Sequence, residues 1–100
     1  MAYFSPVYDD CQVVTTGSSA NVTWTAGPTC LKIVNHSATA AEHVFFKVGT
    51  SSQTATNNDC VVAPGETIYV SVSESDDNIA TLAGRGTPNV SICPGWVNYR

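Results

Sequence analysis

Charged side chains are scarce in this chain. They make up 12% of its 100 residues, against about a quarter in an ordinary globular protein. The basic residues are Lys32, Lys47, Arg85 and Arg100, which lie far apart, and the formal net charge is -4. No basic stripe is available to displace the counterions of DNA or RNA. The sequence therefore predicts a protein without direct contact to nucleic acid.

Long apolar runs are also absent. No stretch approaches the roughly 20 apolar residues of a transmembrane helix. Residues 1–10 lack the basic start and the apolar run of a secretory signal. We therefore expect no membrane partner, and we expect a protein that is synthesised and folded in a cytoplasm.

Cysteine pairs of the CxxC type are missing, which excludes the common ligand spacing of a zinc site. The cysteines are Cys11, Cys30, Cys60 and Cys93. Two disulfides are arithmetically possible in three connectivities, and they would fit an oxidising compartment. Each cysteine, however, lies within or beside an apolar run, and cysteine is among the most buried residue types. We expect free, mostly buried thiols.

Helical periodicity is absent as well, and short β-type runs take its place. Gly, Pro, Asn and Ser separate these runs at intervals of roughly 8 to 12 residues, a pattern typical of a sandwich or a small barrel. A chain of this length has room for one core. The sequence therefore predicts an all-β protein, a single β-sandwich domain over residues 1–100 of jelly-roll or immunoglobulin-like type. The expected strands, about eight, are 11–16, 20–25, 30–34, 43–48, 59–62, 67–72, 79–83 and 89–93.

The runs also predict local features. Gly17 and the two serines after it separate the first two runs, which favours a hairpin. Trp24 falls on the apolar face of its strand by alternation, so it is an expected core residue. Residues 1–10 carry aromatic side chains but no alternation, so we expect an N-terminal arm that lies on the domain or on a neighbouring subunit. Pro94-Gly95 is expected to end the last strand.

Candidate reactive groups are few. Glu74, Asp76 and Asp77 could hold Ca²⁺ through their carboxylates, but they lack the Asp-x-Asp-x-Asp-Gly spacing that makes such a loop specific, so a solvated turn is expected. His36 and His43 have no carboxylate or thiol pattern beside them. No nucleophile elbow occurs in the sequence. We expect no enzyme, no catalytic residue, no cofactor and no metal site.

An ordered set of short motifs runs over about two-thirds of the chain, from Leu31 to Gly95. A strand ending in Asn is followed by a strand ending in Gly, a Pro-Gly turn, Ile-Ala-x-x-Ala-Gly, Gly-Thr and a final strand. This order resembles that of small tailed-bacteriophage virion proteins. The motifs are Leu31-Lys-Ile-Val-Asn35, Val44-Phe-Phe-Lys-Val-Gly49, Cys60-Val-Val-Ala-Pro-Gly65, Glu66-Thr-Ile-Tyr-Val70, Ile79-Ala-Thr-Leu-Ala-Gly84, Gly86-Thr87 and Val90-Ser-Ile.

The resemblance implies a structural protein on the exterior of a virion. It implies a capsid decoration or cement protein that bridges neighbouring subunits, with the major capsid protein and further copies of itself, as a homotrimer, for partners. The sparse charge agrees with a surface that packs against neighbours, and aromatic residues are enriched in the buried centres of interfaces. The interface candidates are Tyr3, Phe4, Tyr8, Phe45, Trp96 and Tyr99.

Other functions remain open from the sequence. A head-to-tail adaptor or tail-associated structural protein would share the same resemblance, but it would assemble as a ring of a few copies. A β-sandwich carbohydrate-binding module would need exposed coplanar aromatic rings on one face of a sheet. An enzyme is the weakest alternative, because no set of acid, base and nucleophile can be named.

Overall fold

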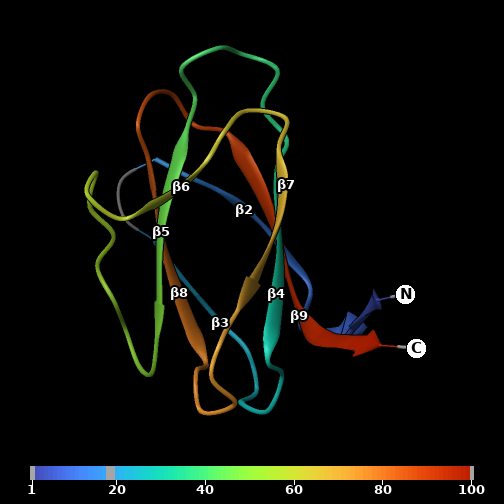
Figure 1. Cartoon of the computed structure of the whole chain (residues 1–100). Coiled ribbons are helices and arrows are strands. Elements are labelled where there is room, and N and C mark those ends of the chain that lie inside the picture. The colour runs from blue at the N-terminus through green and yellow to red at the C-terminus, as the bar shows by residue number, and fades with distance from the viewer. Residues whose placement is uncertain (1, 18–19, 100) are drawn as a thin grey trace.

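The computed structural model describes residues 2–17 and 20–99, with side chains for residues 3–17 and 20–97. It is a sandwich of two antiparallel sheets, seen nearly edge-on in Figure 1, and the predicted all-β sandwich is confirmed. The first sheet, called the β9 sheet, contains β1 (Ala2–Pro6), β2 (Gln12–Thr15), β4 (Cys30–Asn35), β7 (Thr67–Ser71) and β9 (Asn89–Tyr99). The second, called the β8 sheet, contains β3 (Ala20–Thr23), β5 (Val44–Gly49), β6 (Cys60–Val62) and β8 (Asn78–Ala83).

Strand pairing follows a nested order. Leaving β1 aside, the first strand, β2, pairs with the last, β9. The strands between them pair in the same outside-to-inside order: β3 with β8, β4 with β7, and β5 with β6. Two further antiparallel pairings, β4 with β9 and β5 with β8, join the pairs into the two sheets. This is the topology of a jelly roll, in which one long hairpin is rolled into a double sheet.

The hairpin expected around Gly17 is wrong. Strands β2 and β3 pair with β9 and β8, so they lie in different sheets; Ser18 and Ser19 between them lie outside the described residues. A short Gly-containing turn has the same local sequence whether it closes a hairpin or bridges two sheets. In the nested order the partner of each early strand is a late one, and no local signal reports such a distant pairing.

The core lies between the inner faces of the two sheets. Strand alternation directs the apolar residues inward, as the repeated buried positions in β4 show. Trp24 is 6% exposed and lies against this core, as predicted. Each fully buried aliphatic side chain contributes roughly 1.5–3 kcal/mol to folding. The residues at most 1% exposed include Leu31, Ile33, Val44, Val62, Ile79, Val90 and Ile92.

A buried amide ends strand β4. Asn35 is 0% exposed, and its Nδ2 atom donates to the carbonyl oxygens of Glu42 at 2.9 Å and Val62 at 3.3 Å. Its Oδ1 atom accepts the backbone N–H of Ser37 at 3.0 Å. A buried polar group is stable only when it is hydrogen-bonded. Asn35 therefore ties the loop after β4 to strand β6. This role explains why β4 ends in asparagine.

Strand β9 continues through Pro94-Gly95 to Tyr99, so the expected end of the last strand is wrong. The Pro94 carbonyl accepts the Val7 N–H at 2.8 Å, so the proline ring nitrogen faces the same neighbouring segment. Val7 receives no N–H in return, and its carbonyl instead accepts the Asp10 N–H at 3.0 Å. That bond closes the 3₁₀ turn η1 (Tyr8–Asp10). Because the chain leaves the sheet opposite the proline, the missing donor disrupts no ladder.

A disulfide joins Cys11 and Cys93, so the expectation of free thiols is wrong for this pair. Gln12 lies opposite Ile92 in the β2–β9 ladder, and the same register places Cys11 beside Cys93. The two residues are separated by 82 positions, and only the strand pairing brings them together. Cys30 is a free, buried thiol as expected, whereas Cys60 is free but exposed.

Candidate functional site

A two-stranded ribbon extends from one corner of the sandwich. Strand β1 pairs with the last part of β9, from Pro6 opposite Gly95 to Ala2 opposite Tyr99. On the other side of β9 the pairing with β4 stops at Gly95, opposite Cys30. Figure 1 shows both chain ends projecting together away from the packed sheets. The ribbon therefore has strand pairing on one side and an unpaired edge of β9 on the other.

Glycine is required where the ribbon begins. A Cβ atom at Gly95 would overlap the carbonyl oxygen of Ser5 and would lie 2.8 Å from Cζ of Phe4. The Ser5 oxygen belongs to the β1 backbone, so a side chain at Gly95 would have to shift this strand. The absent side chain lets Phe4 lie over β9, and its ring approaches that of Tyr69 on β7 with centroids 5.6 Å apart. The ribbon thus folds toward the outer face of the β9 sheet.

The concave angle between the ribbon and this outer face forms a cavity, here called the corner pocket. Its floor follows one cross-strand row, because Lys32 lies opposite Cys93 on one side and opposite Tyr69 on the other. The cavity volume is about 480 Å³, within the range of about 300–1,000 Å³ typical of binding pockets. It is lined by Phe4, Pro6 and Tyr8, by the Cys11–Cys93 disulfide, and by Lys32 and Tyr69.

One cation lies in this largely apolar lining. The side chain of Lys32 is half-buried, and no described carboxylate forms an ion pair with its ammonium group. A charge in apolar surroundings gains most from an opposite charge, because its own hydration is reduced there. The corner pocket therefore combines aromatic contact surface with a place for one anionic group.

The η1 turn forms the rim of the corner pocket and is fixed on both sides. Before the turn, the Val7 N–H donates to the Pro94 carbonyl at 2.8 Å. After it, the disulfide holds Cys11, and the Asp10 carboxylate accepts the backbone N–H of Thr25 at 3.2 Å. Between these anchors the Tyr8 side chain is 81% exposed and Asp9 is also exposed. The turn therefore presents an aromatic ring and a carboxylate on a rigid backbone.

A smaller depression lies on the other side of the same turn. Its volume is about 160 Å³, and its lining includes Val7, Asp10, Pro28 and Trp96. Trp96 is 44% exposed. It lies opposite Ser5 in the ladder, on the face of the ribbon that also carries Tyr3, because residues two apart in a strand share a face. Tyr3 is 43% exposed.

The structure brings four of the six interface candidates together. Tyr3, Phe4 and Trp96 lie on the ribbon, and Tyr8 lies on the turn beside it. Phe45 is elsewhere, on β5 of the β8 sheet, where its ring is half-buried and would lie 3.1 Å from a Cβ placed on Gly84. The Tyr99 side chain lies outside the described residues.

Sequence reasoning missed other exposed apolar residues, above all Tyr69. Tyr69 is 56% exposed between Ile68 and Val70, which face the core. Period-2 alternation in this strand already placed Tyr69 outward and could have identified it. Its ring plane is tilted by 59° from that of Phe4, so this pair does not form the coplanar platform that a carbohydrate-binding module would need.

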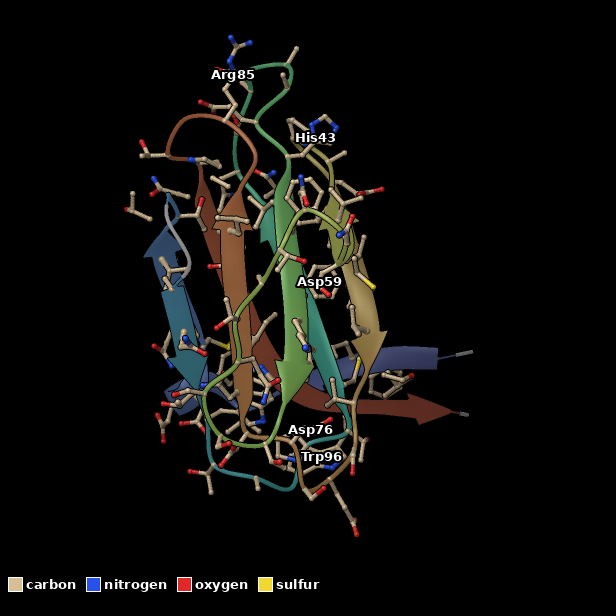
Figure 2. All side chains as sticks on the ribbon, turned by 90° about the vertical axis from the view of Figure 1, so that its left-hand side faces the viewer. His43, Asp59, Asp76, Arg85 and Trp96 are labelled. Atoms are coloured by element: carbon tan, nitrogen blue, oxygen red, sulfur yellow. A yellow bond between two sulfur atoms is a disulfide. The ribbon has the colours of Figure 1, made fainter. Side chains whose placement is uncertain are left out.

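The sequence's reactive candidates do not converge within the described residues. Asp76 accepts the Ser73 N–H at 2.9 Å and closes a turn, whereas Asp77 accepts the Ser51 N–H at 3.0 Å and joins two loops. His36 hydrogen-bonds the Ser91 hydroxyl at 2.6 Å. Figure 2 shows His43 and Asp76 at opposite ends of the sandwich. In residues 2–17 and 20–99 no group of three or more His, Cys, Asp or Glu side chains is placed to hold a metal ion.

Comparison with known proteins adds no family. No family model matches the chain, and no curated protein matches it. Among the residues described, the chain contains no helix of the length and apolarity needed to cross a membrane.

Proposed function

We propose that this chain is a structural virion protein that decorates the exterior of a bacteriophage capsid and bridges neighbouring capsid subunits, as a homotrimer. The observation that carries the proposal is the projecting ribbon. Isolated two-stranded ribbons are marginally stable in water, and this one leaves Tyr3 and Trp96 more than two-fifths exposed. Such an element is best explained as a surface that a neighbour covers.

The sandwich suits the role of a rigid spacer. Its β9 and β8 sheets bury a single apolar core, and the disulfide fixes the base of the ribbon to that core. Contacts made by the ribbon would therefore be transmitted to the whole domain. A capsid could open at such a seam only after the apolar area under the ribbon was exposed again, at about 25 cal/mol per Å².

The surface chemistry also supports contact with protein. Charged residues amount to 12% of the chain, and exposed large apolar side chains on the β9 sheet and its ribbon include Tyr3, Tyr8, Val13, Tyr69 and Trp96. Interface cores are depleted in charge and enriched in aromatic residues. The major capsid protein and further copies of this chain are the proposed partners.

Binding to undecorated capsids tests the proposal. The purified chain is mixed with capsids that lack it, and the bound copies per particle are counted after sedimentation. We expect saturable binding at many equivalent positions, reduced by Trp96→Ser, and unchanged by Val61→Ser. Val61 is 46% exposed on the distant strand β6, so it is the matched control.

Two results would contradict the proposal. The absence of binding would remove the capsid as partner. Binding restricted to a few copies at one vertex would favour the head-to-tail adaptor. Deletion of residues 1–10 is the less specific variant, because it removes β1 and leaves the whole β9 end unpaired.

A further inference from the structure

We infer that the corner pocket receives the η1 turn of a second copy of this chain, with Tyr8 of one copy against Phe4 and Tyr69 of the next and Asp9 beside its Lys32. This contact would join the copies of the proposed homotrimer. Only the number of copies rests on the proposed function. The contact itself is a property of the isolated chain.

The acceptor is the corner pocket. The ring centroids of its aromatic walls, Phe4 and Tyr69, lie 5.6 Å apart and the ring planes are tilted. Aromatic rings pair favourably in offset or edge-to-face arrangements, so a further ring can pack against either wall. Lys32 lies in the floor without a described anionic partner. The pocket therefore fits a segment in which an aromatic side chain stands next to a carboxylate.

The donor is present in the chain itself. Tyr8 is 81% exposed, more than any other exposed large apolar side chain described. The next residue, Asp9, is exposed and makes no hydrogen bond or ion pair through its side chain among the described residues. The Val7–Pro94 hydrogen bond fixes the turn before these two residues, and Asp10 and Cys11 fix it after them. Little conformational entropy would be lost when this turn is bound, which favours association.

Within a single copy, the η1 turn does not occupy the corner pocket. Tyr8 lines the rim of its own corner pocket, yet its 81% exposure shows that its ring does not fill that pocket. Lys32 and Asp9 likewise do not pair within one chain. The η1 turn and the corner pocket are adjacent parts of one surface. A rotation axis near this surface therefore lets each copy insert its turn into one neighbour and accept the turn of another.

Charge complementarity selects a second copy over other occupants. The chain carries a formal net charge of -4, so unspecific contact between copies is repulsive. A contact that places Asp9 of one copy on Lys32 of another replaces part of this repulsion with attraction. Such pairs set register and specificity in interfaces more than they set affinity, so the aromatic contact must supply most of the free energy of association.

Sedimentation equilibrium of the full chain tests the contact. We expect a concentration-dependent rise in mass to a whole multiple of the monomer. Tyr8→Ser is expected to weaken the association on the order of tenfold or more, as for a central interface tyrosine. Tyr3→Ser makes the same chemical change on the other face of the ribbon and is expected to leave the association unchanged. A chain that stays monomeric up to its highest attainable concentration would overturn the inference.

A charge exchange tests the Asp9–Lys32 pairing without altering the core. Asp9→Lys and Lys32→Glu are each expected to weaken the association, and the double variant is expected to restore it. Lys47→Glu makes the same charge change at an exposed position of β5 in the other sheet and serves as the control. Association unaffected by either single change, or no recovery in the double variant, would contradict the pairing.

The capsid-binding experiment separates this contact from the proposed function. A chain that associates through the corner pocket but ignores capsids would support the inference and reject the capsid as partner. A chain that remains monomeric but loses capsid binding on Lys32→Glu would assign the corner pocket to the capsid. The inference and the homotrimer would then be wrong, while the capsid would stand as partner.

Discussion

The two halves of strand β9 share one backbone but differ in their surroundings. From Asn89 to Ile92 the strand lies between β2 and β4, and its inward residues Val90 and Ile92 are 0% exposed. From Trp96 onward the strand pairs with β1 alone among the described residues, and Trp96 is 44% exposed. One half of the strand therefore serves folding, and under the proposed function the other half contacts neighbouring molecules. Substitutions in the two halves should separate stability from binding.

Loss of the disulfide is expected to have the largest effect, because it lies at the border between the two halves. The bond links positions 82 apart, and closing a loop of this length restricts the unfolded chain strongly. The double variant Cys11→Ser with Cys93→Ser is expected to lose about 4 kcal/mol of unfolding free energy, measured by urea titration. Addition of a reductant should lower the stability of the native chain but leave that of the variant unchanged. Equal stability of the two oxidised proteins would contradict this role.

Truncation in the two halves gives the direct comparison. Ile92→Ala removes a fully buried side chain and is expected to cost about 3 kcal/mol. Trp96→Ala, four residues further along the strand in the ribbon, should cost less than about 1 kcal/mol of global stability and should reduce capsid binding. Thermal unfolding and capsid sedimentation of both variants provide the measurements. If Trp96→Ala destabilised the domain as strongly as Ile92→Ala, the ribbon would belong to the core.

Gly95→Ala tests the close backbone approach between β1 and β9 where the two halves of β9 meet. The added Cβ would meet the Ser5 carbonyl oxygen and the Phe4 ring, so we expect a loss of about 1–3 kcal/mol, as for other overpacked sites. Hydrogen exchange should show faster exchange of the β1 amides than of the β2 amides. Gly27→Ala tests the strain of a positive φ without crowding, because nothing lies within 4 Å of a Cβ there. Unchanged protection of β1 in Gly95→Ala would mean that the ribbon does not need this close approach.

The smallest expected effect is a pH dependence carried by Cys30. Alternation places this residue on the outer face with Lys32, but it is 4% exposed beside the start of the ribbon. Burial raises the pKa of its thiol. The unfolded chain therefore loses this proton first, so stability is unaffected below the pKa of an exposed thiol and decreases as the pH rises above it. Urea midpoints between about pH 7 and about pH 10 should fall less in Cys30→Ala than in the native chain.

The core strands could be predicted from the sequence because their signals are local. Alternating apolar residues in 30–34 and 43–48 and the turn residues between runs place β4 and β5 within one residue at either end. Strand β1 and the end of β9 could not be predicted in this way. Their pairing depends on the chain leaving the sheet opposite Pro94 and on the missing side chain of Gly95. In a local sequence pattern, proline and glycine both predict the end of a strand.

The corner pocket could be predicted only in part, for the same reason. Aromatic residues near both ends of the chain predicted a contact surface. Four of these candidates lie on the ribbon and its turn, and two of them, Phe4 and Tyr8, line the corner pocket. The pocket itself needs Lys32 from β4, Tyr69 from β7 and a disulfide across β2 and β9. These residues become neighbours only through the rolled strand order, which sequence spacing does not encode.

The Cys11–Cys93 bond has one more consequence. It turns most of the polypeptide into a covalent ring, since 82 positions separate the linked residues. A protease that nicked an exposed loop inside this ring, such as residues 50–58, would release no fragment, and the packed sheets would hold the cut ends in place. A particle coated with such subunits would keep its coat through isolated proteolytic damage.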